Sequence, residues 1–130
     1  MNLKILNFEK KTSKEGNLFV YEKLSFPEFS FKRLFSVKSK KNSIRGNHAH
    51  KKCTQIIICI NGACEVATFN GKKKEIFLLN KPEIGLLIPP MIWSTQKYLE
   101  QNTIINVLCN ELYDTKDYIH NLDEFKSMIF

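Results

Sequence analysis

The chain has 130 residues, 43% of them hydrophobic and 25% charged, a length and composition that suit one globular domain over residues 1–130. These values exclude fibrous, collagen-like and wholly disordered chains, and the longest apolar runs, such as Ile56 to Ile60, are far shorter than the roughly 20 residues of a membrane span. The 20 Lys and Arg residues against 13 Asp and Glu give a net charge of +7, which favours anionic partners such as nucleic acids or nucleotide diphosphates.

The amino-terminal residues 1–11 have no long apolar core and no small-residue cleavage site, so we expect no secretory leader and a cytoplasmic protein. The chain has four cysteines, none in a CxxC pair: Cys53, Cys59, Cys64 and Cys109. Structural zinc and disulfide frameworks usually show close pairs, so buried, reduced thiols are the preferred interpretation.

Short runs rich in Val, Ile, Phe and Thr, broken by turn residues, predict an all-β protein. The predicted strands are Leu3–Phe8, Leu18–Lys23, Lys32–Val37, Arg45–His50, Thr54–Ile60, Ala63–Phe69, Lys74–Leu79, Gly85–Ile88, Ile92–Lys97 and Thr103–Leu108. Ten short strands with tight turns indicate a barrel or sandwich.

Two Asn-Gly pairs, Asn61-Gly62 and Asn70-Gly71, predict hairpins with type I′ turns. The lysine clusters at 38–41 and 72–74 flank turns, where they keep loops solvated, so we do not expect a nucleic-acid surface. From Asp114 onward, apolar residues recur at helical spacing, which predicts a short helix or two closing one end of the barrel. These residues are Tyr118, Ile119, Leu122, Phe125, Met128 and Ile129.

The segment with the clearest chemical content runs from Arg45 to Lys52 and contains two histidines, His48 and His50. Residues at i and i+2 of a strand share a face, so both imidazoles project to one side. Strict alternation puts Arg45 on the other face unless Gly46 marks a bulge. Solvent-exposed histidines on a strand are the structural alternative.

The sequence has GxHxH at 46–50, a polar residue at Gln55 and a glycine at Gly62. This spacing resembles the first motif of the cupin superfamily. In metal-binding cupins two histidines, a glutamate and a later histidine bind the ion. Here Gln55 and Ser94 stand at the last two ligand positions, and neither an amide nor a hydroxyl is a good ligand for a divalent transition ion. We therefore expect no metal and no other cofactor, and a pair of imidazoles suited to proton transfer.

A closer resemblance is to the nucleotide-sugar 3,4-ketoisomerases. It rests on RGNHAHK together with KEGNL at 14–18, residues 33–37, LLN at 78–80, IPPMIW at 88–93 and the late YD and DYI, and it extends from about Gly16 to Phe125. The resemblance implies a metal-free cupin jelly-roll barrel with a short C-terminal helical tail, typically a dimer that exchanges N-terminal strands. It implies an isomerase that moves the ketone of dTDP-4-keto-6-deoxyglucose from C4 to C3, supplying 3-amino-3,6-dideoxy sugars for lipopolysaccharide, O-antigen or antibiotic glycosylation.

The reaction needs a base for the C3 proton and a group that handles the sugar oxygens of an enediol. We assign the carbon step to His50 and the oxygens to His48 as a hypothesis, which the sequence alone cannot separate. Arg33 and Arg45 are candidates for the diphosphate, with rim salt bridges as the alternative.

Two further residues are candidate substrate contacts. Gln55 orients an imidazole or a sugar hydroxyl, or is simply a satisfied buried amide. Trp93 lines the substrate site or packs in the core. The isolated His120 is expected at the surface.

The sequence departs from the family pattern at Ser36, where a Tyr is frequent beside Phe35, and at Glu15, where an arginine is common. The sequence leaves four competing functions. They are a metal-dependent cupin enzyme, a nucleotide-sugar 3,5-epimerase, a cupin that binds a nucleotide sugar without turnover and, most distantly, a basic protein that binds nucleic acid.

Overall fold

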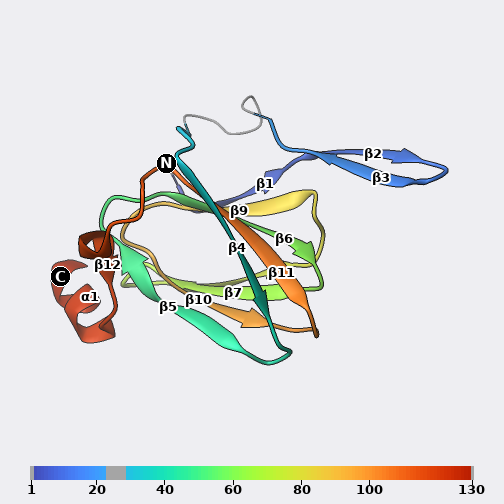
Figure 1. Ribbon diagram of the computed structural model, residues 1–130. Coiled ribbons are helices and arrows are strands. Elements are labelled where there is room, and N and C mark those ends of the chain that lie inside the picture. Colours follow the sequence, from blue (N-terminus) through green and yellow to red (C-terminus); the bar gives the residue numbers. More distant parts are fainter. Residues whose placement is uncertain (1, 23–28, 130) are drawn as a thin grey trace.

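The computed structural model describes residues 2–22 and 29–129, which form two five-stranded antiparallel sheets, a two-stranded hairpin and a short helix (Figure 1). The first sheet has the order β1-β9-β6-β11-β4 and the second β12-β5-β10-β7-β8, while β2 pairs with β3. The strands are β1 (Lys4–Asn7), β2 (Glu9–Ser13), β3 (Gly16–Val20), β4 (Arg33–Ser39), β5 (Ile44–His50), β6 (Gln55–Asn61), β7 (Cys64–Phe69), β8 (Lys74–Leu79), β9 (Ile84–Ile88), β10 (Trp93–Tyr98), β11 (Thr103–Cys109) and β12 (Tyr118–Ile119).

The core lies between the two facing sheets, because alternate residues of each strand point inward. It includes Ile57 and Cys59 of β6, Val66 of β7 and Tyr98 of β10, all almost fully buried. Within the described residues no strand pairing joins the two sheets. The prediction of an all-β jelly roll is therefore confirmed, but the structure is an open sandwich rather than a closed barrel.

A second apolar cluster covers part of the outer face of the first sheet. Ile56 and Ile58 of β6 point outward there and are buried by Phe8 and Phe29 from the N-terminal part of the chain. The sequence of β6 is a continuous apolar run because this strand is buried on both faces.

Each of the ten predicted strands overlaps an observed strand. The second ends at Val20, and its predicted end, Lys23, lies outside the described residues. Two observed strands were not predicted. All five residues of β2 are exposed, so no apolar alternation marks it, and β12 is only two residues long.

The two Asn-Gly predictions have different outcomes: the hairpin at Asn61-Gly62 is wrong, whereas that at Asn70-Gly71 is confirmed with another type of turn. Asn61-Gly62 joins β6 to β7, but these strands belong to different sheets, so it is a crossover and not a hairpin. Asn70-Gly71 does lie in a hairpin, yet the register pairs Phe69 with Lys74, which leaves residues 70–73 in a longer loop. There the Asn70 side chain accepts bonds from the backbone N–H groups of Lys72 and Lys73, both at 2.8 Å, instead of forming a type I′ turn.

The C-terminal tail forms the predicted helix only in part. Helix α1 (Leu122–Ile129) covers one end of the sandwich, where Phe125 is buried against Ala49 and Ile119. The predicted helical residues Tyr118 and Ile119 instead form β12, which pairs with His50 and Ala49 of β5. A 3-10 turn, η2 (Thr115–Asp117), leads into it.

The cysteine prediction is confirmed, since all four thiols are free and buried. In the part of the chain that the structure describes, no helix is both long and apolar enough to span a membrane.

Candidate active site

A β-bulge in β5 sets the direction of the residues in the HxH motif. The register pairs His48 with Ser94 and Gly46 with Thr95, so Asn47 is an extra residue on β5. Gly46 and Asn47 both have positive φ, 87° and 59°. A Cβ on Gly46 would lie 2.6 Å from Gln96 Oε1 and 3.0 Å from the Ser94 carbonyl, so this position requires glycine.

The two histidines of β5 lie side by side, as the i, i+2 spacing predicts. Their ring centroids are 5.0 Å apart in an edge-to-face arrangement. His48 stands across from the buried Ser94 on the inner face of the second sheet, and it is half-buried, whereas only 6% of His50 is exposed.

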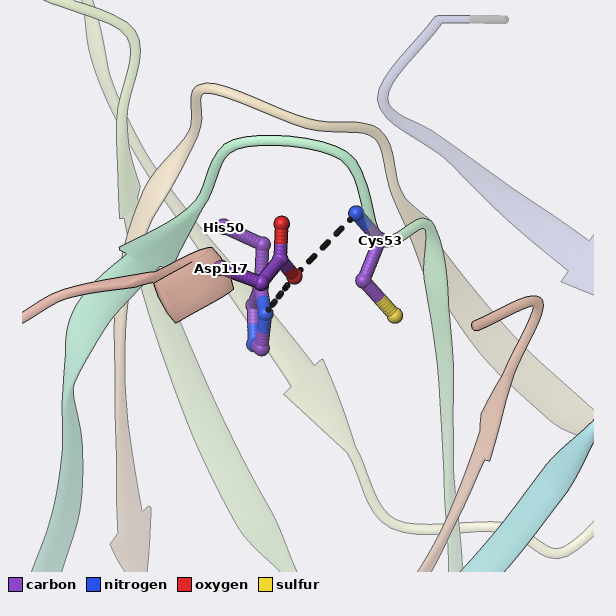
Figure 2. Close-up of side chains that lie close together, drawn as sticks. All are labelled: His50, Cys53 and Asp117. Carbon is purple, nitrogen blue, oxygen red and sulfur yellow. Dashed lines mark hydrogen bonds and ion pairs between the residues drawn. The ribbon is translucent and has the colours of Figure 1, made fainter. Parts of the chain in front are cut away.

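Asp117, at the end of η2, fixes the buried histidine (Figure 2). Its Oδ2 lies 2.9 Å from His50 Nδ1 and accepts from the Cys53 backbone N–H at 3.3 Å, while its Oδ1 accepts from the Lys52 N–H at 2.6 Å. The carboxylate thus joins the strand end of β5, the following loop and the C-terminal tail.

Hydrogen-bond partners define the tautomer of each ring. His48 Nδ1 lies 3.1 Å from the Gly46 carbonyl, and a carbonyl can only accept, so this Nδ1 carries a proton. The Asp117 carboxylate imposes the same tautomer on His50. In the neutral rings both Nε2 atoms therefore keep a free lone pair, and that of His50 is buried with no hydrogen-bond partner among the described residues.

The electrostatics keep both imidazoles neutral. Burial lowers the pKa of His48 to about 4, helped by the charge of His50 and opposed by the Gly46 carbonyl. Burial also lowers the pKa of His50, although the hydrogen bond and charge of Asp117 oppose it. Burial by itself raises the pKa of Asp117, but the hydrogen bonds from His50, Lys52 and Cys53 outweigh it, so this pKa lies below its usual value. Neutral imidazoles at physiological pH are available as bases.

Tyr118 of β12 brings a third imidazole to the pair. Its ring lies 4.3 Å from that of His50 and 5.0 Å from that of His48 between centroids, and it stacks on His120 at 5.4 Å. His120 is exposed, as predicted, but it is not isolated, because its ring lies 5.8 Å from that of His48.

Arg33 and Gln55 approach the same end of the sandwich from the first sheet. Arg33 of β4 contacts the rings of Phe35 and Tyr113, at 5.3 and 5.5 Å from the guanidinium carbon to the centroids. It also bonds to Tyr118, and its charge lowers the pKa of His50. Gln55 of β6 is 7% exposed and donates to Cys109.

The structure separates the other two predicted substrate residues from this cluster. The bulge puts Arg45 on the face of the histidines, paired with Gln96, but Arg45 is exposed and its charge acts on Tyr98, where it opposes the rise that burial causes in that pKa. Trp93 faces the opposite side of β10 from Ser94 and packs against Phe125 of α1, 5.8 Å between ring centroids. Trp93 therefore has the packing contacts that its core-packing alternative expects.

Neither position that departs from the family pattern lies beside the histidines in this chain. Ser36 is on the outer face of β4 and donates to Asn106 Oδ1 at 2.6 Å, whereas Phe35 contacts Arg33. Glu15 is in the turn between β2 and β3, which projects away from the sandwich (Figure 1).

A metal site can be tested against the donor atoms. His50, Cys53 and Asp117 offer ligand atoms within 4.8 Å of one another (Figure 2). Both oxygens of Asp117 already accept hydrogen bonds, and the Cys53 thiol donates to the Thr54 carbonyl at 3.4 Å, while its hydrogen bond to Cys109 and burial raise the pKa of Cys53. Transition ions bind the thiolate; the donor set suits a hydrogen-bonded network better than an ion.

The sequence analysis assigned no functional role to Asp117, Tyr118 and Cys109. In the structure Asp117 and Tyr118 contact His50, and Cys109 contacts Arg33. Asp117 and Tyr118 belong to the late DYI string of the family resemblance. An acidic residue beside apolar ones in a short tail was the available signal, but its partner His50 lies 67 residues away.

Comparison with known proteins gives concordant matches over nearly the full chain. Residues 1–129 match the family described as FdtA, WxcM-like, C-terminal. The chain is 34% identical to TDP-4-oxo-6-deoxy-alpha-D-glucose-3,4-oxoisomerase of Aneurinibacillus thermoaerophilus, covering 99% of this chain and 94% of that protein.

Two solved structures are closely similar. QdtA, a sugar 3,4-ketoisomerase from Thermoanaerobacterium thermosaccharolyticum in complex with TDP, has a TM-score of 0.93 at 32% identity, covering 98% of this chain and 94% of that one. A variant of QdtA with one histidine replaced by asparagine is solved with TDP-4-keto-6-deoxyglucose. WlaRA, a TDP-fucose-3,4-ketoisomerase from Campylobacter jejuni, has a TM-score of 0.90 at 36% identity, covering 100% and 97% of the two chains.

Proposed function

Because this chain belongs to the FdtA family of nucleotide-sugar 3,4-ketoisomerases, we propose that it moves the ketone of a TDP-linked 4-keto-6-deoxy sugar from C4 to C3. The family resemblance inferred from the sequence is thereby confirmed. The observation that carries the proposal is the pair of adjacent imidazoles, His48 and His50, whose Nδ1 atoms are both engaged, while His50 Nε2 is buried with no hydrogen-bond partner among the described residues. The product, a 3-keto-6-deoxy sugar nucleotide, suits later amination at C3 for a surface polysaccharide.

The reaction is a proton transfer in two carbon steps. The C4 ketone acidifies the C3 proton, a base removes it, and an enediol forms as protons move between O3 and O4. Return of a proton to C4 leaves the ketone at C3. One base that reaches both carbons from the same face suffices, with a second group acting at the oxygens.

The burial of the two rings supports giving the carbon steps to His48. The hypothesis drawn from the sequence gave them to His50 and stays a prediction. A base must come within hydrogen-bond distance of the proton it takes, and His48 is the more exposed ring, whereas His50 Nε2 has almost no exposed surface. The buried Nε2 of His50 needs a hydrogen-bond partner, and a sugar oxygen can supply this hydrogen bond directly or through a bridging water.

Arg33 is the residue we assign to the substrate's negative charge. Its guanidinium lies between the rings of Phe35 and Tyr113 and beside Tyr118, and its Nε is buried without a hydrogen-bond partner among the described residues. A guanidinium can bind a diphosphate through two parallel bonds. This proposal gives only secondary roles in substrate binding to Arg45, which lies at the other end of β5 from His50, and to Gln55, which like Arg33 contacts Cys109. It gives Trp93 no role in substrate binding.

We also propose that the enzyme works as a homodimer in the cytoplasm. The β2–β3 hairpin extends from the sandwich (Figure 1) and pairs only with itself among the described strands, and Leu18 on it is 59% exposed. A second copy of the chain is the partner that a projecting hairpin of this kind fits. The four free thiols are compatible with a reducing compartment. Light scattering of the full chain and of a variant lacking residues 9–20 tests the dimer, which only the full chain should form.

Proton NMR of the sugar after incubation with TDP-4-keto-6-deoxyglucose tests the activity. In heavy water we expect a 3-keto product that carries deuterium at C4, and 4-keto sugar re-formed by the reverse reaction that carries deuterium at C3. Label at C3 and C5 without ketone transfer would identify a 3,5-epimerase, and saturable binding of TDP with an unchanged sugar would identify a binding protein. Turnover that disappears with a chelator and returns with iron or manganese would identify a metal-dependent enzyme.

A further inference from the structure

Three side chains form a row across the first sheet at the end that carries the active-site cluster. Cys109 of β11 pairs in register with Arg33 of β4 on one side and with Gln55 of β6 on the other. Arg33 Nη2 lies 3.4 Å from Cys109 Sγ, and Gln55 Nε2 lies 3.5 Å from it. Cys109 itself is fully buried.

The groups around this sulfur are hydrogen-bond donors. A guanidinium has no acceptor atom, and the amide nitrogen of Gln55 donates as well. On a third side lies the thiol of Cys53, which interacts with Cys109 and donates to the Thr54 carbonyl at 3.4 Å. A thiolate at Cys109 accepts the hydrogen bonds from Arg33 and Gln55 more strongly than a neutral thiol does, and the guanidinium places a positive charge beside it.

The charges and hydrogen bonds around Cys109 also favour its thiolate form. The hydrogen bond from Cys53, together with those from Gln55 and Arg33 and the charge of Arg33, lowers the pKa of Cys109 to about 6, although burial opposes the shift. Tyr118 of β12 also faces this group, and Asp117 acts on Cys53. The positive charge of Arg33 is the nearest compensation for an anion here.

We propose that Cys109 is a buried thiolate that acts as a positioning residue for the arginine that binds the substrate. It pairs with the inner side of the Arg33 guanidinium, which the rings of Phe35 and Tyr113 hold from other directions. It also reduces the positive field that Arg33 exerts on His50. The substrate-binding part of this inference rests on the proposed function, whereas the ionisation of Cys109 does not.

Ultraviolet absorbance of the thiolate tests the ionisation without any substrate. The other buried thiols are expected to be protonated at neutral pH, because burial raises the pKa of Cys59 to about 11 and that of Cys64 to about 12, and the pKa of Cys53 is also raised. Folded wild-type protein should show one thiolate at neutral pH. Cys109→Ser should abolish this signal, and Cys59→Ser, a matched substitution of a buried thiol distant from the row, should retain it. Equal spectra for the two variants would overturn the proposal.

Affinity for TDP, measured by calorimetry, tests the positioning. Loss of a charge-assisted bond should weaken TDP binding by about tenfold in Cys109→Ser, and KM should rise correspondingly while kcat changes by less than about threefold. Cys109→Asp restores an anion of similar size and should recover most of the affinity, and Cys59→Ser should bind as the wild type does.

The other possible results of these experiments each support or refute a stated part of the proposal. If Cys109→Ser does not fold, the wild-type absorbance and the Cys109→Asp variant still decide the case. Unchanged TDP affinity in Cys109→Ser, or failure of Cys109→Asp to recover it, would refute the positioning role. A wild-type protein that shows the thiolate but binds no TDP would refute the proposed function instead.

Discussion

Asp117→Asn is the substitution that most sharply separates chemistry from packing at this site. The carboxylate accepts three hydrogen bonds, from His50 Nδ1 and the Cys53 N–H at Oδ2 and from the Lys52 N–H at Oδ1. An asparagine has one oxygen, so its NH2 group must face either the Lys52 N–H or the pair formed by His50 and the Cys53 N–H. In the first case two donors meet 2.6 Å apart; in the second, His50 is driven to the other tautomer and Nε2 loses its free lone pair.

The magnitudes follow from these two arrangements. One unsatisfied buried donor costs about 1–3 kcal/mol, so urea denaturation should show a loss of stability of that size. A histidine in the wrong tautomer loses its role in proton transfer, which is worth about 10²- to 10⁴-fold in rate, so kcat should fall by that order.

The dependence of stability on pH gives a second readout. Because the folded pKa of Asp117 lies below its usual value, its stabilisation is complete above the unfolded pKa of about 4 and is lost as pH falls through the folded pKa. The stability difference between wild type and Asp117→Asn should therefore narrow below about pH 4.

Asp114→Asn is the matched control for Asp117→Asn. Asp114 also accepts a backbone bond, from the Lys116 N–H at 2.9 Å, but it is exposed and asparagine caps equally well. Turnover of Asp117→Asn within about threefold of the wild type, with stability equal to that of Asp114→Asn, would refute the reasoning.

Three further predictions concern the surroundings of Asp117 and β5. The acid limb of kcat/KM should fall as pH drops through about 4, not through 6.5, since His48 must be neutral to act as a base; a limb near 6.5 in a pH-rate profile contradicts the burial argument. Gly46→Ala places a Cβ 2.6 Å from Gln96 Oε1 at a φ of 87°, and should cost about 1–3 kcal/mol in urea denaturation, so an unchanged midpoint argues against the bulge. Trp93→Leu should cost about 1–3 kcal/mol of stability through lost packing on Phe125 with KM for the sugar nucleotide unchanged; a large rise in KM with little destabilisation would restore Trp93 to the substrate site.

The sequence predicted the features that depend on local periodicity. His48 and His50 share a face because strand side chains alternate, and that rule needs no knowledge of the partner strand. Arg45 shows its limit: the extra residue at Asn47 moves Arg45 to the face of the histidines, and only the possibility of a bulge at Gly46 could be read in advance.

Features that depend on distant partners could not be predicted. Tyr118, Ile119, Leu122 and Phe125 fit helical spacing, yet the first two pair with β5 because they gain strand hydrogen bonds there. Asn61-Gly62 is a hairpin signal that the structure uses to cross between sheets. The row of Arg33, Cys109 and Gln55 comes from three strands that are far apart in sequence.

The division of labour between the two histidines is tested most directly by proton exchange at the sugar carbon. The measurement is the rate at which C3–H of TDP-4-keto-6-deoxyglucose is replaced by deuterium in heavy water, compared for His48→Asn, His50→Asn and the wild type. We predict that His48→Asn loses this exchange by about 10²- to 10⁴-fold, while His50→Asn keeps more of the exchange and loses ketone transfer. Exchange at the wild-type rate in His48→Asn would contradict the account.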